Sequence, residues 1–225
     1  MKIIIHTDEY YPTPQACSYR MQTMAEEFVN EGNEVTVITS STNVENGVVG
    51  DRKERILYSP AIRMKKKTTI MRMLNNLSFG ISSIFTACKV GNADIVITTS
   101  PPPLISIAGF IIAKTKGAKL IYDVRDIWPD VALEMGSFSE DSLYCKIFRM
   151  ITNFMYKHSD MVTTVSPGKV KKLQDHVSSV CQNDIKAIEK IKLVGNGFDT
   201  NVENFDIDDE LIKRYDLKNV FTCVY

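Results

Sequence analysis

Short apolar runs alternate with longer amphipathic segments along most of the chain, and this alternation is the main clue to its fold. The runs are rich in Ile and Val and barely alternate in polarity, which is typical of strands buried on both faces of a sheet. They lie at residues 2–6, 34–39, 94–99, 119–124, 161–166 and 191–196, with a weaker candidate at 54–59. The pattern therefore predicts a sheet of buried strands.

The segments between these runs carry apolar residues at helical spacing. The clearest face, in residues 16–32, is made of Cys17, Met21, Met24, Ala25, Phe28 and Val29. Further helices are expected at 104–117, 143–159 and 168–181. Strand-helix-strand units of this length form right-handed crossovers and a parallel sheet. We therefore expect an α/β domain over residues 1–200, with a Rossmann-like parallel sheet and helices on both of its faces.

Residues 62–89 combine a basic cluster with an amphipathic helix. The cluster consists of Arg63, Lys65, Lys66, Lys67 and Arg72. The expected core stripe of the helix consists of Ile70, Leu74, Leu77, Ile81 and Ile84. Because anionic lipids attract such clusters, one interpretation is peripheral contact with the cytoplasmic face of an inner membrane. The other interpretation is a solvated basic turn in front of a packed helix.

The last 25 residues, 201–225, differ from the repeating pattern before them. A short helix leads into the apolar run "VFTCVY" at 220–225. A strand needs neighbours, so we interpret this segment as a linker and the first strand of a second, carboxyl-terminal domain. The alternative is an edge strand of the main sheet.

Composition excludes several classes of protein. The 225 residues are 44% hydrophobic, and 27 basic residues balance 27 acidic ones. A neutral chain lacks the basic footprint of a nucleic-acid-binding protein. The five cysteines form no CxxC pair, and no metal site is expected, so reduced thiols in a cytoplasmic protein are the simplest interpretation. The apolar run at the amino terminus is too short for a signal peptide.

The loops that follow the predicted strands hold the candidate chemistry, because ligands of open parallel sheets bind beyond the carboxyl ends of the strands. These loops read "TDEYYPTPQACSYR", "SPPPL", "RDIWPD", "SPG" and "GNGFDT". Ser100 and Ser166 are candidate contacts in two of them, although helix capping alone would explain Ser166. The glycine fingerprint GxGxxG is absent, so a dinucleotide bound in the usual manner is not expected.

The motifs "DVRDIWPD", "TTSPPPL", "TTVSPG" and "KLVGNGFDT", in this order, resemble the amino-terminal half of GT-B glycosyltransferases of family four. The similarity is greatest to the bacterial enzymes that build capsule, O-antigen and exopolysaccharide. The resemblance implies a hexosyltransferase-type enzyme that retains anomeric configuration and needs neither cofactor nor metal. The partners it implies are a nucleotide-diphosphate-sugar donor, held by the second domain, and a lipid-linked or oligosaccharide acceptor.

The resemblance also assigns roles to individual residues. Arg125 and Asp126 take the catalytic positions, where Arg125 replaces the histidine of many relatives. The donor-side loop before the linker consists of Asn196, Gly197 and Asp199. The expected acceptor contacts are Tyr11, Ser18, Arg20, Ser100, Trp128, Asp130 and Ser166. Without its donor domain, the chain is expected to be inactive.

Two other functions remain open from the sequence. The chain is either such an acceptor domain or a non-enzymatic module that binds a sugar or a partner, including one half of a split transferase. A nucleotide-sugar 2-epimerase of the same architecture ranks last, because "RDIWPD" fits the transferases better.

Overall fold

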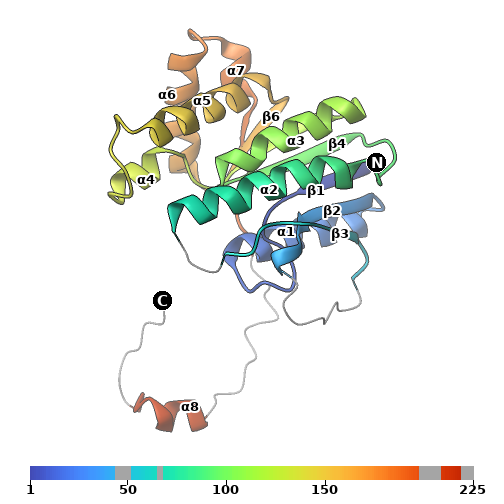
Figure 1. Ribbon diagram of the computed structural model, residues 1–225, viewed down its shortest axis with the longest axis vertical. Coiled ribbons are helices and arrows are strands. Elements are labelled where there is room, and N and C mark those ends of the chain that lie inside the picture. The colour runs from blue at the N-terminus through green and yellow to red at the C-terminus, as the bar shows by residue number, and fades with distance from the viewer. Residues whose placement is uncertain (44–51, 65–67, 198–208, 219–225) are drawn as a thin grey trace.

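The computed structural model describes residues 1–43, 52–64, 68–197 and 209–218. Within these residues the chain forms a seven-stranded sheet in the order β3-β2-β1-β4-β5-β6-β7, in which all neighbours are parallel (Figure 1). The strands are β1 Lys2–His6, β2 Glu34–Ser40, β3 Arg55–Ser59, β4 Ile95–Ser100, β5 Lys119–Val124, β6 Met161–Thr164 and β7 Ile191–Leu193. Every predicted strand up to residue 196 is confirmed, including the weak candidate at 54–59.

The helices of the structure match the predicted ones and add two short ones. They are α1 Ala16–Asn30, α2 Thr69–Ala87, α3 Pro103–Lys116, α4 Asp130–Glu134, α5 Leu143–His158, α6 Pro167–Val180, α7 Ile185–Glu189 and α8 Asp209–Arg214. The sequence pattern did not indicate α4 or α7, which have five residues each and are too short for a helical period to be recognised. The predicted short helix near residue 211 corresponds to α8.

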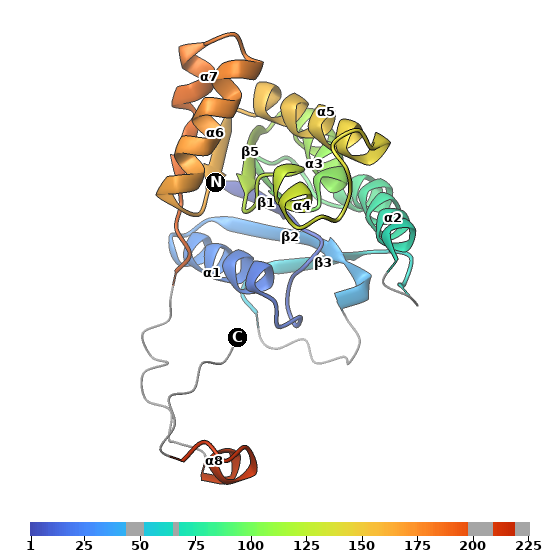
Figure 2. The ribbon, with the colours of Figure 1, turned by 90° about the vertical axis from the view of Figure 1, so that its left-hand side faces the viewer.

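Apolar side chains leave both faces of the sheet, which explains why the strands barely alternate in polarity. From one face, Ile4, Val96 and Leu120 point into a large core shared with α3, α5 and α6. From the other face, Ile5 and Val37 point into a smaller core beneath α1. Helices therefore cover both faces, with α1 on one side and α2, α3 and α5 on the other (Figure 2). The predicted Rossmann-like class is confirmed.

Helix α3 lies unusually close to the sheet at Gly109. A Cβ atom added there would lie 2.5 Å from Thr98 Cβ and 2.4 Å from Thr98 Oγ1. Only a residue without a side chain permits this approach. The helix ends at Gly117, whose φ of +64° is the left-handed conformation that favours glycine at this position. Gly109 thus sets how closely α3 packs against β4, and Gly117 sets where the helix ends.

The predicted core stripe of α2 is wrong. Ile70, Leu74, Leu77 and Ile81 are exposed, and only Ile84 of the stripe packs against the core. The buried face consists instead of Asn75, Phe79, Gly80, Ser83, Thr86 and Ala87. These are mostly small residues that allow close packing on α3, and their polar atoms find partners inside. A prediction from apolar residues alone therefore selected the face that points away from the core.

Part of the carboxyl-terminal prediction lies outside the described residues. This is the case for residues 198–208 and 219–225, which include the linker and the predicted strand "VFTCVY". A domain boundary at residue 200 stays a prediction. Among the described helices, none combines the length and the apolarity needed to cross a membrane.

Candidate functional site

Polar groups from three loops meet at the carboxyl ends of the central strands. Arg125, directly after β5, donates from Nη2 to the carbonyl oxygen of Pro101 after β4, at 2.6 Å. Lys169, in the first turn of α6, donates from Nζ to Asp126 Oδ1 at 2.8 Å and also to the carbonyl oxygen of Arg125. The side chain of Asp126 is 42% exposed, so a ligand can reach this ion pair. The structure thus brings Arg125 and Asp126 together with a lysine that the sequence reasoning left out.

Asp8 lies beside this group, after β1. Strand order reverses at β1, since β2 lies on one side of it and β4 on the other, and such a switch point is where open parallel sheets bind ligands. Asp8 Oδ1 and Arg125 Nε are both shielded from solvent and have no hydrogen-bond partner among the described residues. Loss of solvation and the neighbouring Glu9 raise the pKa of the Asp8 carboxyl to about 7, while Arg125 acts in the opposite direction. Near neutral pH this carboxyl is therefore ready to accept or release a proton.

Arg20 lies in a buried network below the edge of the sheet. Its Nε and Nη2 donate to the two carboxylate oxygens of Asp123 at 3.0 and 2.8 Å. Its Nη1 donates to the carbonyl oxygen of Gly195 and to Asn196 Oδ1, both at 3.0 Å. Thr163 adds a hydrogen bond to Asp123 at 2.6 Å. Arg20, predicted to contact the acceptor, thus connects α1 to β5 and to the loop that follows β7.

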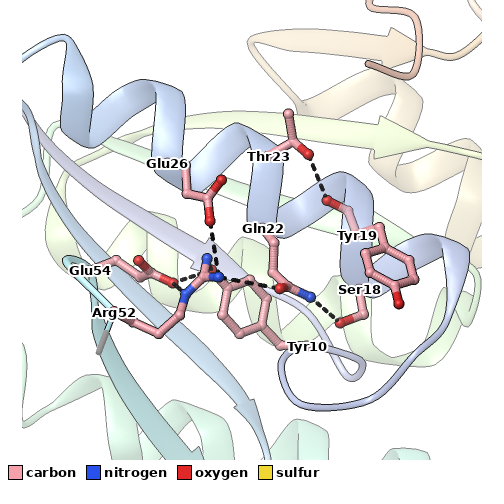
Figure 3. A network of polar contacts seen from close by, with 8 residues as sticks. All are labelled: Tyr10, Ser18, Tyr19, Gln22, Thr23, Glu26, Arg52 and Glu54. Atoms are coloured by element: carbon pink, nitrogen blue, oxygen red, sulfur yellow. Dashed lines mark hydrogen bonds and ion pairs between the residues drawn. The ribbon is translucent and has the colours of Figure 1, made fainter. Parts of the chain in front are cut away.

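A second polar network also involves α1 and includes Ser18 (Figure 3). Arg52 pairs with Glu54 at 2.6 Å and with Glu26 at 3.0 Å, and it also bonds Gln22 at 3.3 Å. Gln22 in turn donates to Ser18 Oγ at 2.7 Å. Ser18 is fully buried, so a ligand cannot reach its hydroxyl in this conformation. The network attaches α1 to the beginning of β3.

Two predicted acceptor contacts lie next to structural groups. The half-buried Tyr11 has the guanidinium of Arg52 over its ring, 5.4 Å from the centroid. Ser166 is the N-cap of α6 and accepts a hydrogen bond from the backbone of Lys169 at 3.4 Å. Capping, the alternative role for Ser166, is therefore confirmed. A contact of either residue with an acceptor stays a prediction.

The remaining predicted acceptor contacts surround the loop after β5. Trp128 packs on Phe138 and Phe148, with ring centroids 6.0 and 5.6 Å away, so it supports the loop while remaining half-exposed. Asp130 begins α4 and lies 3.9 Å from Arg149. Ser100 is buried at the end of β4.

The remaining predicted residues lie in other segments of the chain or outside the described residues. Gly197 lies close to α1, where an added Cβ would be 3.4 Å from Thr23 Cγ2. Arg63 and Arg72 are exposed on either side of the start of α2. The predicted residues outside the described ones are Lys65, Lys66, Lys67 and Asp199.

Two other reactive side chains near β1 have structural roles. His6 Nδ1 bonds Thr98 Oγ1 at 3.0 Å and His6 Nε2 bonds Ser83 Oγ at 2.9 Å, and burial lowers its pKa to about 3. The imidazole is therefore neutral and occupied on both nitrogens. Burial raises the pKa of the Cys17 thiol to about 12, so a reactive thiolate is absent there. Among the described residues, no group of His, Cys, Asp and Glu could hold a metal ion.

A hollow of about 360 Å³ at the opposite end of β6 and β7 is a weaker candidate for a site. Its lining includes Lys157, Cys181 and Lys190. Lys190 Nζ already donates to the carbonyl oxygens of Lys157 and Ser159, at 3.1 and 3.0 Å. The ammonium group of Lys190 is thus occupied by backbone carbonyl oxygens. We therefore place the functional site at the carboxyl edge, around Asp8, Arg125, Asp126 and Lys169.

Comparisons with known proteins agree on the fold. No family description matches the chain, and no curated protein matches it. A structure of HepE (Alr3699) from Anabaena in complex with UDP and glucose is similar to it, with a TM-score of 0.57 and 16% identity over 97% of this chain and 51% of that chain. The catalytic domain of starch synthase IV from Arabidopsis thaliana, bound to ADP and acarbose, gives a TM-score of 0.62 and 12% identity over 92% and 54%.

A third structure, Os79 from O. sativa in complex with UDP, gives a TM-score of 0.57 and 10% identity over 96% of this chain and 57% of that chain. At these identities the similarity concerns the fold. The chain spans about half the length of the solved structures it matches. Its fold is therefore that of one half of a GT-B glycosyltransferase.

Proposed function

We propose that this chain is the acceptor-side domain of a retaining glycosyltransferase of family four. The enzyme would move a sugar from a nucleotide-diphosphate sugar to a lipid-linked or oligosaccharide acceptor during synthesis of a bacterial surface polysaccharide. The observation that carries the proposal is the meeting of Asp8, Arg125, Asp126 and Lys169 at the switch point of a sheet with this fold. The proposed donor domain faces this edge.

The roles follow from the charges and the exposure of these groups. Asp126 presents its carboxylate to an acceptor hydroxyl, and the ion pair with Lys169 holds that carboxylate in position. Arg125, held by its bond to the carbonyl oxygen of Pro101, supplies positive charge beside the acceptor. In the transfer, a bond forms between the acceptor oxygen and the anomeric carbon of the donor sugar. The bond from that carbon to the diphosphate breaks, and the hydroxyl proton ends on the released nucleoside diphosphate.

The donor belongs to the other half of the proposed enzyme. UDP and UDP-glucose are bound by HepE, which makes UDP-glucose the first donor to test.

The test is substitution of Asp126 in the full-length protein. Asp126→Ala is expected to lower transfer about 100-fold, which is the scale of losing the orientation of a reacting group. The matched control is Asp175→Ala, which removes an exposed carboxylate from α6, the helix that carries Lys169. Equal transfer rates for Asp126→Ala and wild type would remove this loop from the active site.

One half of a split transferase is a second candidate, since the chain covers about half of each matched structure. In that enzyme the donor domain is a separate polypeptide. The intact mass of the native gene product distinguishes the two cases. A mass well above 25.4 kDa supports a single two-domain chain, and a mass of 25.4 kDa supports the split enzyme.

A further inference from the structure

The outward face of α2 is an apolar stripe that no other part of the described chain covers. Its members are spaced by three or four residues and therefore follow one another along one side of the helix. They are Ile70, Leu74, Leu77, Ile81 and Phe85, with exposed fractions between 43% and 70%. An amphipathic helix normally turns such a stripe towards the core. Here the core contact uses the opposite face, so the stripe is available for something outside the described fold.

The segment in front of α2 extends this apolar surface. Asn75 Nδ2 donates to the carbonyl oxygen of Ile62 at 2.7 Å, and Ile62 N donates to Ser78 Oγ at 2.9 Å. These bonds fasten the segment along the helix, and the side chains of Ile62 and Met64 are exposed beside it. Of the sixteen large apolar side chains exposed in the described residues, seven lie between 62 and 85. Such clustering marks an interaction surface, because exposed apolar residues are usually scattered singly.

The charge around this surface has one sign. Residues 55–93 contain seven Lys and Arg residues and no Asp or Glu, although the chain as a whole is neutral. Helix α3, which packs against α2, and helix α5, which packs against α3, also lack acidic residues. Their basic residues, together with that of α2, are Arg72, Lys114, Lys116, Lys146, Arg149 and Lys157. Of these, Arg149 pairs with Asp130 and Glu140 at its end of α5. On the opposite side of the sheet, α1 carries Glu26 and Glu27. Basic residues thus predominate around the apolar stripe.

From these observations we infer that the outward face of α2, with Ile62 and Met64, binds the surface of an anionic lipid bilayer. Apolar side chains enter the boundary between headgroups and acyl chains, and the surrounding cations meet lipid phosphates. A second copy of the chain fits this face less well, because two equally basic surfaces would repel each other. The inference concerns a surface other than the candidate site, and it holds whether or not the chain takes part in sugar transfer.

The position of this surface adds a consequence that does rest on the proposed function. The chain leaves β3 at Ser59, at the carboxyl edge of the sheet, and α2 begins ten residues later at Thr69. The start of α2 therefore lies towards the same edge as Asp126. A bilayer on this face would bring a lipid-linked acceptor close to the candidate site.

The test is sedimentation of the full-length protein with vesicles of phosphatidylcholine, alone or with phosphatidylglycerol at roughly 30% of the lipid, a typical anionic fraction. Binding is expected only to the anionic vesicles. Ile81→Gln/Phe85→Gln is expected to weaken it about 10-fold or more, because two large side chains no longer leave water. Arg63→Gln is expected to weaken it about fivefold, the scale of one cation near such a surface. Raising the salt to about 1 M shortens the screening length to about 3 Å and should release the protein.

The control is Ile185→Gln, which replaces an equally exposed isoleucine on α7 and should leave binding unchanged. Circular dichroism shows that each variant is folded, as expected for exposed positions. The inference is overturned if the wild type does not bind anionic vesicles, or if Ile81→Gln/Phe85→Gln binds them equally well. It is also overturned if ultracentrifugation shows a dimer that this double variant separates. Asp126→Ala should bind vesicles normally. A failed transfer assay therefore does not affect the outcome of the vesicle test.

Discussion

Removing Arg20 should destabilise the chain more than almost any other single change at the carboxyl edge. The side chains of Arg20 and Asp123 are only 4% and 0% exposed, and two hydrogen bonds of 3.0 and 2.8 Å join them. Arg20→Met keeps most of the apolar stem but leaves the carboxylate of Asp123 buried without a cation. Breaking a buried pair in this way costs about 3–5 kcal/mol. The loss of the bonds to Gly195 and Asn196 adds to this cost.

The double variant Arg20→Met/Asp123→Leu separates the ion pair from simple packing. Replacing both members of a buried pair with apolar residues is often close to neutral, because no charge remains buried. Here Thr163 loses its acceptor, which costs about 1–3 kcal/mol. The double variant is therefore expected to be more stable than Arg20→Met alone.

Urea unfolding followed by circular dichroism measures both effects. The expected order of unfolding free energies is wild type, double variant, then Arg20→Met. The reasoning is refuted if Arg20→Met loses less than about 1 kcal/mol, the scale of an exposed ion pair. It is also refuted if the double variant loses at least as much as Arg20→Met, because the two residues would then not act as a buried pair.

Two further predictions concern packing and pH. Gly109→Ala should destabilise by about 1–3 kcal/mol in urea unfolding, since its Cβ would overlap Thr98, whereas Gly80→Ala, with its nearest neighbour at 3.8 Å, should be neutral or stabilising. The raised pKa of Asp8, about 7, contributes stability that is complete below its ordinary pKa and is lost as pH rises through 7. The lowered pKa of His6, about 3, contributes stability that is present above 6.5 and is lost as pH falls towards 3. Between pH 7 and 4 the two oppose each other, so unfolding free energies should fall on acidification in Asp8→Asn and rise in His6→Gln. Equal slopes in the two variants would contradict these assignments.

The strands could be predicted from the sequence because most of their residues point into one core or the other. Ile4 and Ile5, for example, are adjacent in the chain and buried on opposite faces. Such a run of apolar residues leaves little choice of structure. Helix α2 was different, because its inward face was selected by shape and by internal hydrogen bonds. Ser83 is buried through its bond to His6, while the apolar Ile81 faces outward.

The candidate site could be placed at the carboxyl edge from the sequence, but its partners could not. Lys169 lies 43 residues from Asp126 in the chain, and only the sheet brings them within 2.8 Å. The one available signal was its place in the loop motif "SPGK" after β6. Asp8 also follows a strand, but its raised pKa depends on burial and on Glu9 and Arg125, which a sequence does not show. For Arg20 the sequence predicted an acceptor contact, but it could not show that the fold gives this cation a buried partner, Asp123.

The most direct test of the central claim is release of nucleoside diphosphate by the native gene product. The protein is supplied with a panel of nucleotide sugars, beginning with UDP-glucose, and with a lipid extract from its own cells as acceptor. The account predicts release that depends on the extract and falls about 100-fold in Asp126→Ala, while Asp175→Ala keeps the wild-type rate. Release by Asp126→Ala at the wild-type rate, or no release from any donor in the presence of the extract, would contradict it.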